Sequence, residues 1–259
     1  MRDLLKMAKD AAIAAGKVLR DLVGCVHEVR YKGEVNLVTE ADLAAEQVIL
    51  DAIRTTYPDH AILSEEGGTG APLTGSDMLW VVDPLDGTTN FAHGYPVFCV
   101  SIALLIKGRP SIGVIYDPMR DELFEAARGL GARLNGRPMH VSACPELQRA
   151  LVCTGFVYDR GDALDAPLRR FARMQKASEG LRRDGSAALN MAYTACGRFD
   201  AFFELHLNPW DVAAGFVLVE EAGGRITRSN GQPAGVFDGD VVASNGLIHD
   251  EVLAVLQKE

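Results

Sequence analysis

Apolar residues recur at helical spacing in six stretches of the chain. Residues 3–23 repeat leucine, valine and alanine every three or four positions and end at Gly24, which predicts a first helix. A second helix is predicted from Thr39, a residue that can cap it, to the position before Pro58. The same spacing predicts four later helices, over residues 164–176, 186–196, 212–222 and 248–257.

Short apolar runs between these helices predict strands. Residues 60–66 and 79–82 form two such runs, separated by a glycine-rich loop over residues 67–76. From residue 97 onward, β-rich runs separated by KGRP, DPMRD and a glycine cluster predict antiparallel hairpins in one sheet. Later strands are predicted at residues 151–156, 180–185, 198–205, 224–230 and 240–246.

Alternating strands and helices imply layers of helix on sheet. A boundary near residues 141–148 separates an α+β half, residues 1–145, from an α/β half, residues 146–259. No flexible linker is evident between them, so we expect one compact unit.

The composition narrows the class of partner. A formal net charge of -9 argues against a general nucleic-acid binder or a protein that binds anionic membranes. No apolar run has the roughly 18 residues of a membrane span, and the charged N-terminus has no signal-peptide core. The five cysteines lack CxxC spacing and are typical of small buried residues in a reducing compartment. We therefore expect a cytoplasmic protein.

Several predicted elements begin or end in an acid. Glu65 follows the strand at residues 60–66, Asp83 and Asp86 follow the strand at 79–82, and Asp42 and Asp211 lie at helix starts. Carboxylates without an accompanying His or Cys cluster suit Mg²⁺. One such acid alone would be typical of a solvated surface charge, but several acids at the ends of apolar segments leave both interpretations open.

The stretch WVVDPLDGTTN, residues 80–90, concentrates this chemistry. Pro84 restricts the backbone between the two aspartates, and the residues from Gly87 onward resemble the start of a helix, whose free amides bind anions such as phosphate. A plain tight turn with a capping threonine explains Gly87 and Thr88. It does not explain two acids after an apolar strand.

These segments together resemble a known family. DPLDGTTNF, with SEE and TEAD upstream and PWDVAAG downstream, is similar to the inositol monophosphatase family, a branch of the Mg²⁺-dependent, lithium-sensitive phosphatases. The resemblance covers nearly the whole chain. It implies a layered α-β-α-β-α sandwich of the inositol monophosphatase and fructose-1,6-bisphosphatase type, a homodimer, and hydrolysis of a phosphate monoester by metal-activated water.

The resemblance also implies a role for each acid. One Mg²⁺ would bind Glu65, Asp83 and the carbonyl of Leu85, and a second would bind Asp83, Asp86 and Asp211. A third, looser ion would involve Glu65 and, through water, Asp42. Thr88, paired with Glu65, would orient the attacking water, and the amides of Gly87 and Thr88 would hold the phosphate.

The resemblance further implies that the leaving group contacts residues from the second half of the chain. Gly185, Ser186 and Ala187 would offer amides to a polyol, and Glu204 would bind its hydroxyls with help from Asp86 and Asp211. The alternative for Glu204 is a solvated charge at a strand end. The motif DGTTNF is similar to that of the inositol branch of the family, so inositol 1-phosphate is the expected substrate. Fructose 1,6-bisphosphate, a broad range of sugar and polyol phosphates, and a binding role with the transcription machinery are the alternatives.

Two positions depart from the family pattern. Asn36 stands where some relatives have an aspartate, and Asp184 precedes GSAA where a neutral residue is expected. A negative charge at Asp184 is expected to disfavour a second phosphate on the substrate. A bisphosphate would require a basic cluster near the leaving group, for which Arg182 and Arg183 are candidates unless they serve a dimer interface.

Overall fold

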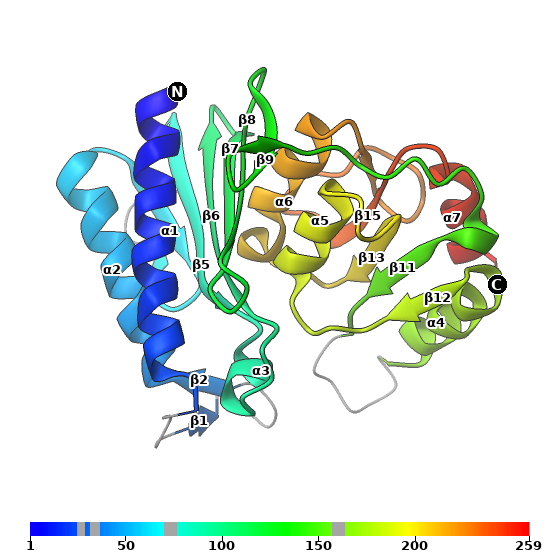
Figure 1. Cartoon of the computed structure of the whole chain (residues 1–259), viewed down its shortest axis with the longest axis horizontal. Coiled ribbons are helices and arrows are strands. Elements are labelled where there is room, and N and C mark those ends of the chain that lie inside the picture. Colours follow the sequence, from blue (N-terminus) through cyan, green and yellow to red (C-terminus); the bar gives the residue numbers. More distant parts are fainter. Residues whose placement is uncertain (25–28, 32–36, 70–76, 157–163, 259) are drawn as a thin grey trace.

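The computed structural model describes residues 1–24, 29–31, 37–69, 77–156 and 164–258. They form five layers in the order helices, sheet, helices, sheet, helices (Figure 1). The helices are α1 (Arg2–Leu22), α2 (Glu40–Thr56), α3 (Thr88–Ala92), α4 (Asp165–Ala177), α5 (Ala187–Ala195), α6 (Pro209–Glu221) and α7 (His249–Leu256). The layered sandwich confirms the predicted fold class.

The first sheet has eight strands in the order β10-β9-β8-β7-β6-β5-β3-β4. They are β3 (Ala61–Ser64), β4 (Gly68–Thr69), β5 (Met78–Asp86), β6 (Cys99–Ile106), β7 (Arg109–Asp117), β8 (Glu122–Ala127), β9 (Gly131–Leu134) and β10 (Arg137–Pro138). All neighbours are antiparallel except β3 and β5, which run parallel. The predicted hairpins after residue 97 are therefore confirmed.

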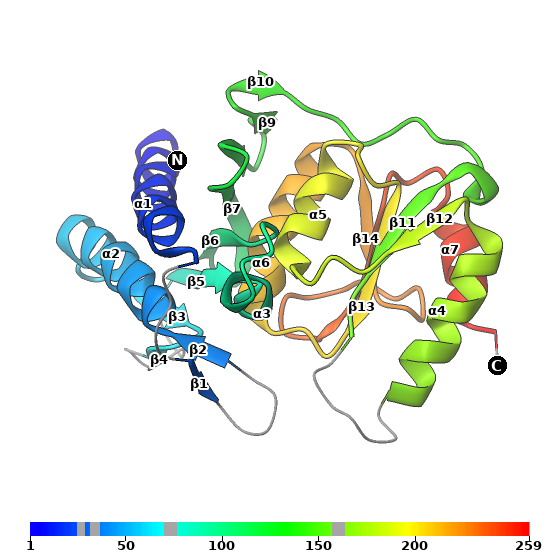
Figure 2. The same cartoon turned by 60° about the horizontal axis from the view of Figure 1, so that its bottom comes forward.

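The second sheet has five strands in the order β12-β11-β13-β15-β14. They are β11 (Leu151–Thr154), β12 (Gly180–Arg182), β13 (Ala201–Leu205), β14 (Arg225–Thr227) and β15 (Asp240–Ser244). Helices α4 and α7 cover one face of this sheet and α5 and α6 cover the other (Figure 2). A separate two-stranded ribbon pairs β1 (Val29–Tyr31) with β2 (Leu37–Thr39).

Alternation along the strands explains how the first sheet is covered on both faces. In β6, Val100, Ile102 and Leu104 pack with α1 and α2, whereas Ala103 and Leu105 belong to the core shared with α5 and α6. Successive side chains of a strand point to opposite faces, so a strand buried on both sides is apolar throughout. A third core lies between the second sheet and helices α4 and α7.

The strand predicted over residues 79–82 is too short. Strand β5 continues to Asp86, and its register against β6 shifts between Asp83 and Asp86. Pro84 has no N–H to give to the ladder, so it occurs at a bulge in the strand. Helix α6 also begins earlier than predicted, at Pro209, the residue type favoured in a first helical turn.

Some expectations concern residues that the structure leaves undescribed. Asn36 and most of the loop at residues 67–76 lie outside the described ranges, as does the side chain of Thr39. Among the helices that are described, none combines the length and the apolar composition needed to cross a bilayer.

Gly113 allows α6 to lie close to β7. A Cβ atom added at Gly113 would be 2.3 Å from the carbonyl oxygen of Ala214, a backbone atom that cannot move aside alone. We expect Gly113→Ala to lower the melting temperature by roughly 3–8 °C, as overpacking of a core does. Thermal unfolding followed by circular dichroism measures this shift.

Gly235→Ala is the matched control, because its added Cβ would meet nothing nearer than 3.6 Å. Its melting temperature should stay within about 1–2 °C of the wild type. A Gly113→Ala protein as stable as this control would contradict the close packing of α6 on β7.

Candidate active site

Four of the five predicted acids line one cavity of about 260 Å³. Its lining includes the predicted metal ligands Glu65, Asp83, Leu85, Asp86 and Asp211, and the predicted substrate residues Gly87, Thr88, Gly185, Ser186, Ala187 and Glu204. Asp42 is wholly buried in α2 and is not part of the lining. Residues far apart in the sequence are thus brought to one place.

The end of β5 shapes the cavity floor. Asp83 accepts a hydrogen bond from the Leu85 N–H at 3.0 Å, and Thr88 donates its hydroxyl to the Leu85 carbonyl at 3.1 Å. Gly87 has a φ of 100°, and a Cβ there would be 2.9 Å from the Val97 carbonyl oxygen. Only glycine meets both requirements, so Gly87 fixes the sharp passage from β5 into α3.

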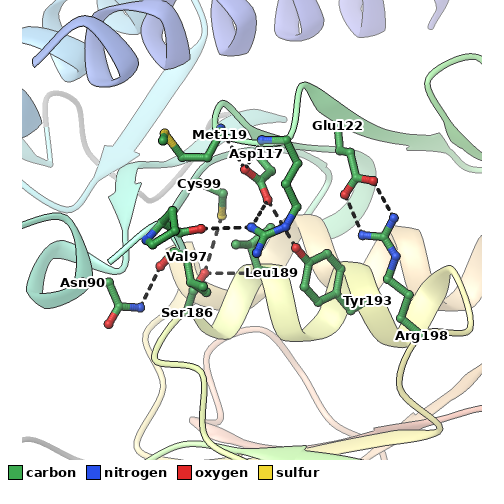
Figure 3. Close-up of polar contacts among 12 residues, drawn as sticks. Asn90, Val97, Cys99, Asp117, Met119, Glu122, Ser186, Leu189, Tyr193 and Arg198 are labelled. Atoms are coloured by element: carbon green, nitrogen blue, oxygen red, sulfur yellow. Dashed lines mark hydrogen bonds and ion pairs between the residues drawn. The ribbon is translucent and has the colours of Figure 1, made fainter. Parts of the chain in front are cut away.

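Asp86 ties the first sheet to helix α5. Its Oδ2 accepts the hydroxyl of Ser186 at 2.5 Å and the N–H of Ala188 at 2.7 Å. Ser186 is also the N-cap of α5 and accepts the Leu189 N–H at 3.4 Å (Figure 3). A carboxylate suits this position because the first N–H groups of a helix lack partners within the helix.

Asp211 is fixed by the start of α6. Asn208 and Asp211 form a capping box, in which Asp211 Oδ2 accepts the Asn208 N–H at 2.6 Å. The spacing of Asn208 and Asp211 in NPWD is the sequence signal for this motif. The box orients the Asp211 carboxyl group at the cavity wall.

Burial and mutual repulsion disfavour the charged forms of these acids. The pKa of Asp83 is raised well above its usual value, first by burial and then by the charges of Glu65, Asp86, Asp211 and Asp42. Burial also raises the pKa of Asp86, and burial together with the charge of Asp86 raises that of Asp211. A cation among these groups would relieve the repulsion.

The donor set fits Mg²⁺. Carboxylate and carbonyl oxygens line the cavity without cysteine, as a hard divalent cation requires. In the described part of the chain, no three His, Cys, Asp or Glu side chains are already arranged to hold a metal ion. The individual ligand roles of Glu65, Asp83, Leu85, Asp86 and Asp211 therefore stay predictions.

Glu204 lies at another part of the cavity, on β13. Burial and the charges of Asp211 and Asp86 raise the pKa of Glu204 to about 8, and Arg183 opposes this shift. A Cβ added at Gly155 would overlap the Glu204 carboxylate, so this glycine makes room for it. Gly155 is a functional candidate that the sequence pattern did not reveal.

The two residues before GSAA differ in their placement. Arg183 lines the cavity, whereas Asp184 is not among the lining residues described. The Asp184 carbonyl instead accepts a hydrogen bond from the side chain of Asn90 at 2.8 Å. The expected effect of a negative charge at Asp184 on a second phosphate therefore has no support from this arrangement.

Asn90, in α3, links the segment before β6 to the loop before α5. Its Nδ2 donates to the carbonyl of Val97 at 2.7 Å (Figure 3) and also to that of Asp184. The other end of α5 is tied to the same sheet by Tyr193, whose hydroxyl donates to Asp117 at 3.2 Å. Asn90 closes the WVVDPLDGTTN stretch, yet its partner at Asp184 is 94 residues away and is not visible in a local pattern.

Comparison with known proteins decides the family. The model of the inositol monophosphatase family matches residues 1–259. The chain belongs to this family. It is 47% identical over 253 residues to an inositol-1-monophosphatase of Synechocystis sp., covering 97% of this chain and 88% of the relative. It is also 45% identical over 262 residues to the Nus factor SuhB of Pseudomonas aeruginosa, covering 99% and 97%.

Solved structures agree with this assignment. The inositol monophosphatase of Anabaena superimposes with a TM-score of 0.87 at 46% identity, covering 98% of this chain and 95% of the other. The extragenic suppressor protein suhB of Bartonella henselae gives a TM-score of 0.94 at 38% identity, covering 99% of both chains. This member of the inositol monophosphatase family is an enzyme, a phosphatase.

Asn90→Ala should weaken substrate binding more than turnover. The substitution leaves two partly buried carbonyls without their donor, which costs about 1–3 kcal/mol and loosens the loop before α5. We expect the KM of the variant for its phosphate monoester substrate to rise about tenfold, while kcat changes less. Asn230→Ala, which removes one hydrogen bond from a surface turn, is the control. An unchanged KM would contradict a positioning role for Asn90.

Glu204→Gln should stabilise the metal-free protein at alkaline pH. Because the folded pKa of about 8 exceeds the usual 4.5, the wild type loses stability as pH rises from about 4.5 to 8. We expect the variant to melt roughly 5 °C higher at pH 8 and to differ little near pH 4.5. Thermal unfolding with a chelator present, across this pH range, tests the sign. A variant less stable than the wild type at pH 8 would refute it.

Proposed function

We propose that this phosphatase hydrolyses inositol 1-phosphate to inositol and phosphate in a Mg²⁺-dependent reaction. The observation that carries the proposal is the single cavity in which Glu65, Asp83, Asp86 and Asp211 lie together with Glu204. Acids at one end suit metal ions, and an acid at the other end suits the hydroxyls of a polyol. The name of the Synechocystis relative supports the same substrate.

Two or three Mg²⁺ ions per subunit, when bound, would acidify water and neutralise charge on the transferring phosphoryl group. Glu65, Asp83, Asp86, Asp211 and the Leu85 carbonyl would hold them, with Asp42 acting through water. Each of these positions is an oxygen donor, which is the ligand type that Mg²⁺ prefers.

The remaining residues would act on water and substrate. Thr88 and Glu65 would orient the attacking water, while the amides of Gly87 and Thr88 would hold the phosphate oxygens. The left-handed backbone of Gly87 supports this arrangement, since it starts α3 at the cavity floor. Gly185, Ser186, Ala187 and Glu204, with Asp86 and Asp211, would contact the leaving group.

The charges around the cavity favour a monophosphate. Arg183 is the one lysine or arginine among the described lining residues, and it lies near enough to Glu204 to lower its pKa. A second phosphate would need several such cations where Glu204 places a carboxylate instead. Fructose 1,6-bisphosphate is therefore the less favoured substrate.

A role with the transcription machinery is the second candidate. It is favoured by the Pseudomonas aeruginosa relative, whose name describes a Nus factor. The cytoplasmic location, the homodimer and the lithium sensitivity expected from the sequence belong to the proposal as well. All of them are compatible with an active phosphatase.

A phosphate-release screen with Mg²⁺ tests the substrate. The panel contains inositol 1-phosphate, glycerol 2-phosphate, fructose 1,6-bisphosphate, histidinol phosphate and 3′-phosphoadenosine 5′-phosphate. We expect kcat/KM for inositol 1-phosphate to exceed that for the bisphosphate by at least about tenfold, a difference of roughly 1.4 kcal/mol. Millimolar lithium should inhibit the reaction. A preference for the bisphosphate would refute the proposed specificity.

Asp83→Asn in the same screen tests the site. Loss of a charge shared by two metal positions should lower kcat/KM by at least about 100-fold at saturating Mg²⁺. Asp51→Asn, an exposed residue on α2 that accepts a hydrogen bond from Gln47, is the control and should keep normal activity. Normal turnover by Asp83→Asn would exclude the proposed metal site.

A further inference from the structure

Glu46 holds the segment that carries Glu65. Its side chain lies on α2 and is only 7% exposed. Its Oε1 accepts hydrogen bonds from the Ser64 hydroxyl and, at 2.8 Å, from the Gly67 N–H. These two donors flank Glu65 and Glu66, so one carboxylate oxygen closes the chain into a tight loop around them.

The loop is held from its other side by the sheet. The Glu65 N–H donates to the carbonyl of Val82 in β5 at 3.2 Å, one residue before Asp83. Glu65 is therefore fixed between β5 and α2. A glycine at position 67 makes the closure possible, because its Cβ position is 3.3 Å from Glu46 Oε1 and a larger side chain would crowd it.

Helix α2 delivers Glu46 together with Asp42. The two acids are four residues apart, which places them on the same face of the helix one turn apart, and both are buried. Asp42 lies close enough to Asp83 to raise its pKa. Glu46 therefore lies next to the cluster of buried acids, and it contacts the backbone segment that carries Glu65.

We propose that Glu46 is a positioning residue: its hydrogen bonds to Ser64 and Gly67 set the orientation of Glu65 toward a divalent cation. Glu46 is not among the described residues that line the cavity, so its proposed effect on the site is exerted through Glu65. Residues that orient metal ligands in this way typically affect metal affinity or activity by about 10- to 100-fold. The inference rests on the proposed Mg²⁺-dependent function.

Two substitutions separate hydrogen bonding from charge. Both bonds converge on Oε1, so the carboxamide oxygen of Glu46→Gln can accept both, whereas Glu46→Ala accepts neither. We expect Glu46→Ala to weaken Mg²⁺ binding in titration calorimetry by about 10- to 100-fold and to raise the Mg²⁺ concentration for half-maximal activity equally. Glu46→Gln should restore both quantities to within about threefold of the wild type.

Two further variants keep the test decisive if Glu46→Ala folds poorly. Ser64→Ala removes one of the two donors and should give an intermediate loss of Mg²⁺ affinity. Glu125→Gln alters another buried acid of the first sheet, 5% exposed and paired with Lys9 at 2.6 Å, and should leave Mg²⁺ binding unchanged. Equal Mg²⁺ affinity in the wild type, Ser64→Ala and Glu46→Ala would overturn the positioning role.

The same measurements distinguish an error in the role of Glu46 from an error in the proposed function. A wild type that binds no Mg²⁺ and releases no phosphate would refute the function. A wild type that does both, with Glu46→Gln as impaired as Glu46→Ala, would show that the charge matters and that hydrogen-bond positioning does not.

Discussion

Mutual repulsion between buried carboxylates is the constraint on which the rest of this structure depends. Asp83 and Asp86 are 1% and 9% exposed, and Glu65 and Asp211 share their cavity. Charges removed from water in this way oppose folding unless hydrogen bonds or cations compensate. Backbone N–H groups of Leu85, Ala188 and Asn208 each donate to one of these acids, so the fold supplies part of the compensation and a bound cation would supply the remainder.

Much of the fold and of the site could be predicted because the deciding signals are local. Helical spacing located α1 and α5, and alternating apolar runs located the hairpins from β6 to β9. Asp83 and Asp86 indicated a functional site because acidic residues are unusual directly after an apolar strand. The family resemblance predicted that these separate segments contribute to one site.

What could not be predicted depends on contacts between distant segments. The bond from Ser186 to Asp86 joins residues 100 positions apart, and that from Asn90 to Asp184 joins residues 94 apart. Strand β5 passes through Pro84 because β6 continues beside it, which no pattern within residues 80–90 indicates. For the same reason Glu46, one of many helix glutamates, gave no sign that it closes the Glu65 loop.

The close approach of α6 to Gly113 has a consequence for the order of events during synthesis. The sheet face around β7 is apolar, and the helix that covers it ends only at Glu221. The strands of the first sheet are synthesised before α6. The apolar face around β7 therefore stays uncovered by α6 while about 100 further residues are made. Contacts of such sequence separation slow folding and leave apolar surface exposed to other chains. Helix α6 therefore has two effects: it brings Asp211 to the active site, and it completes the cover of an apolar sheet face that is open to other chains until then.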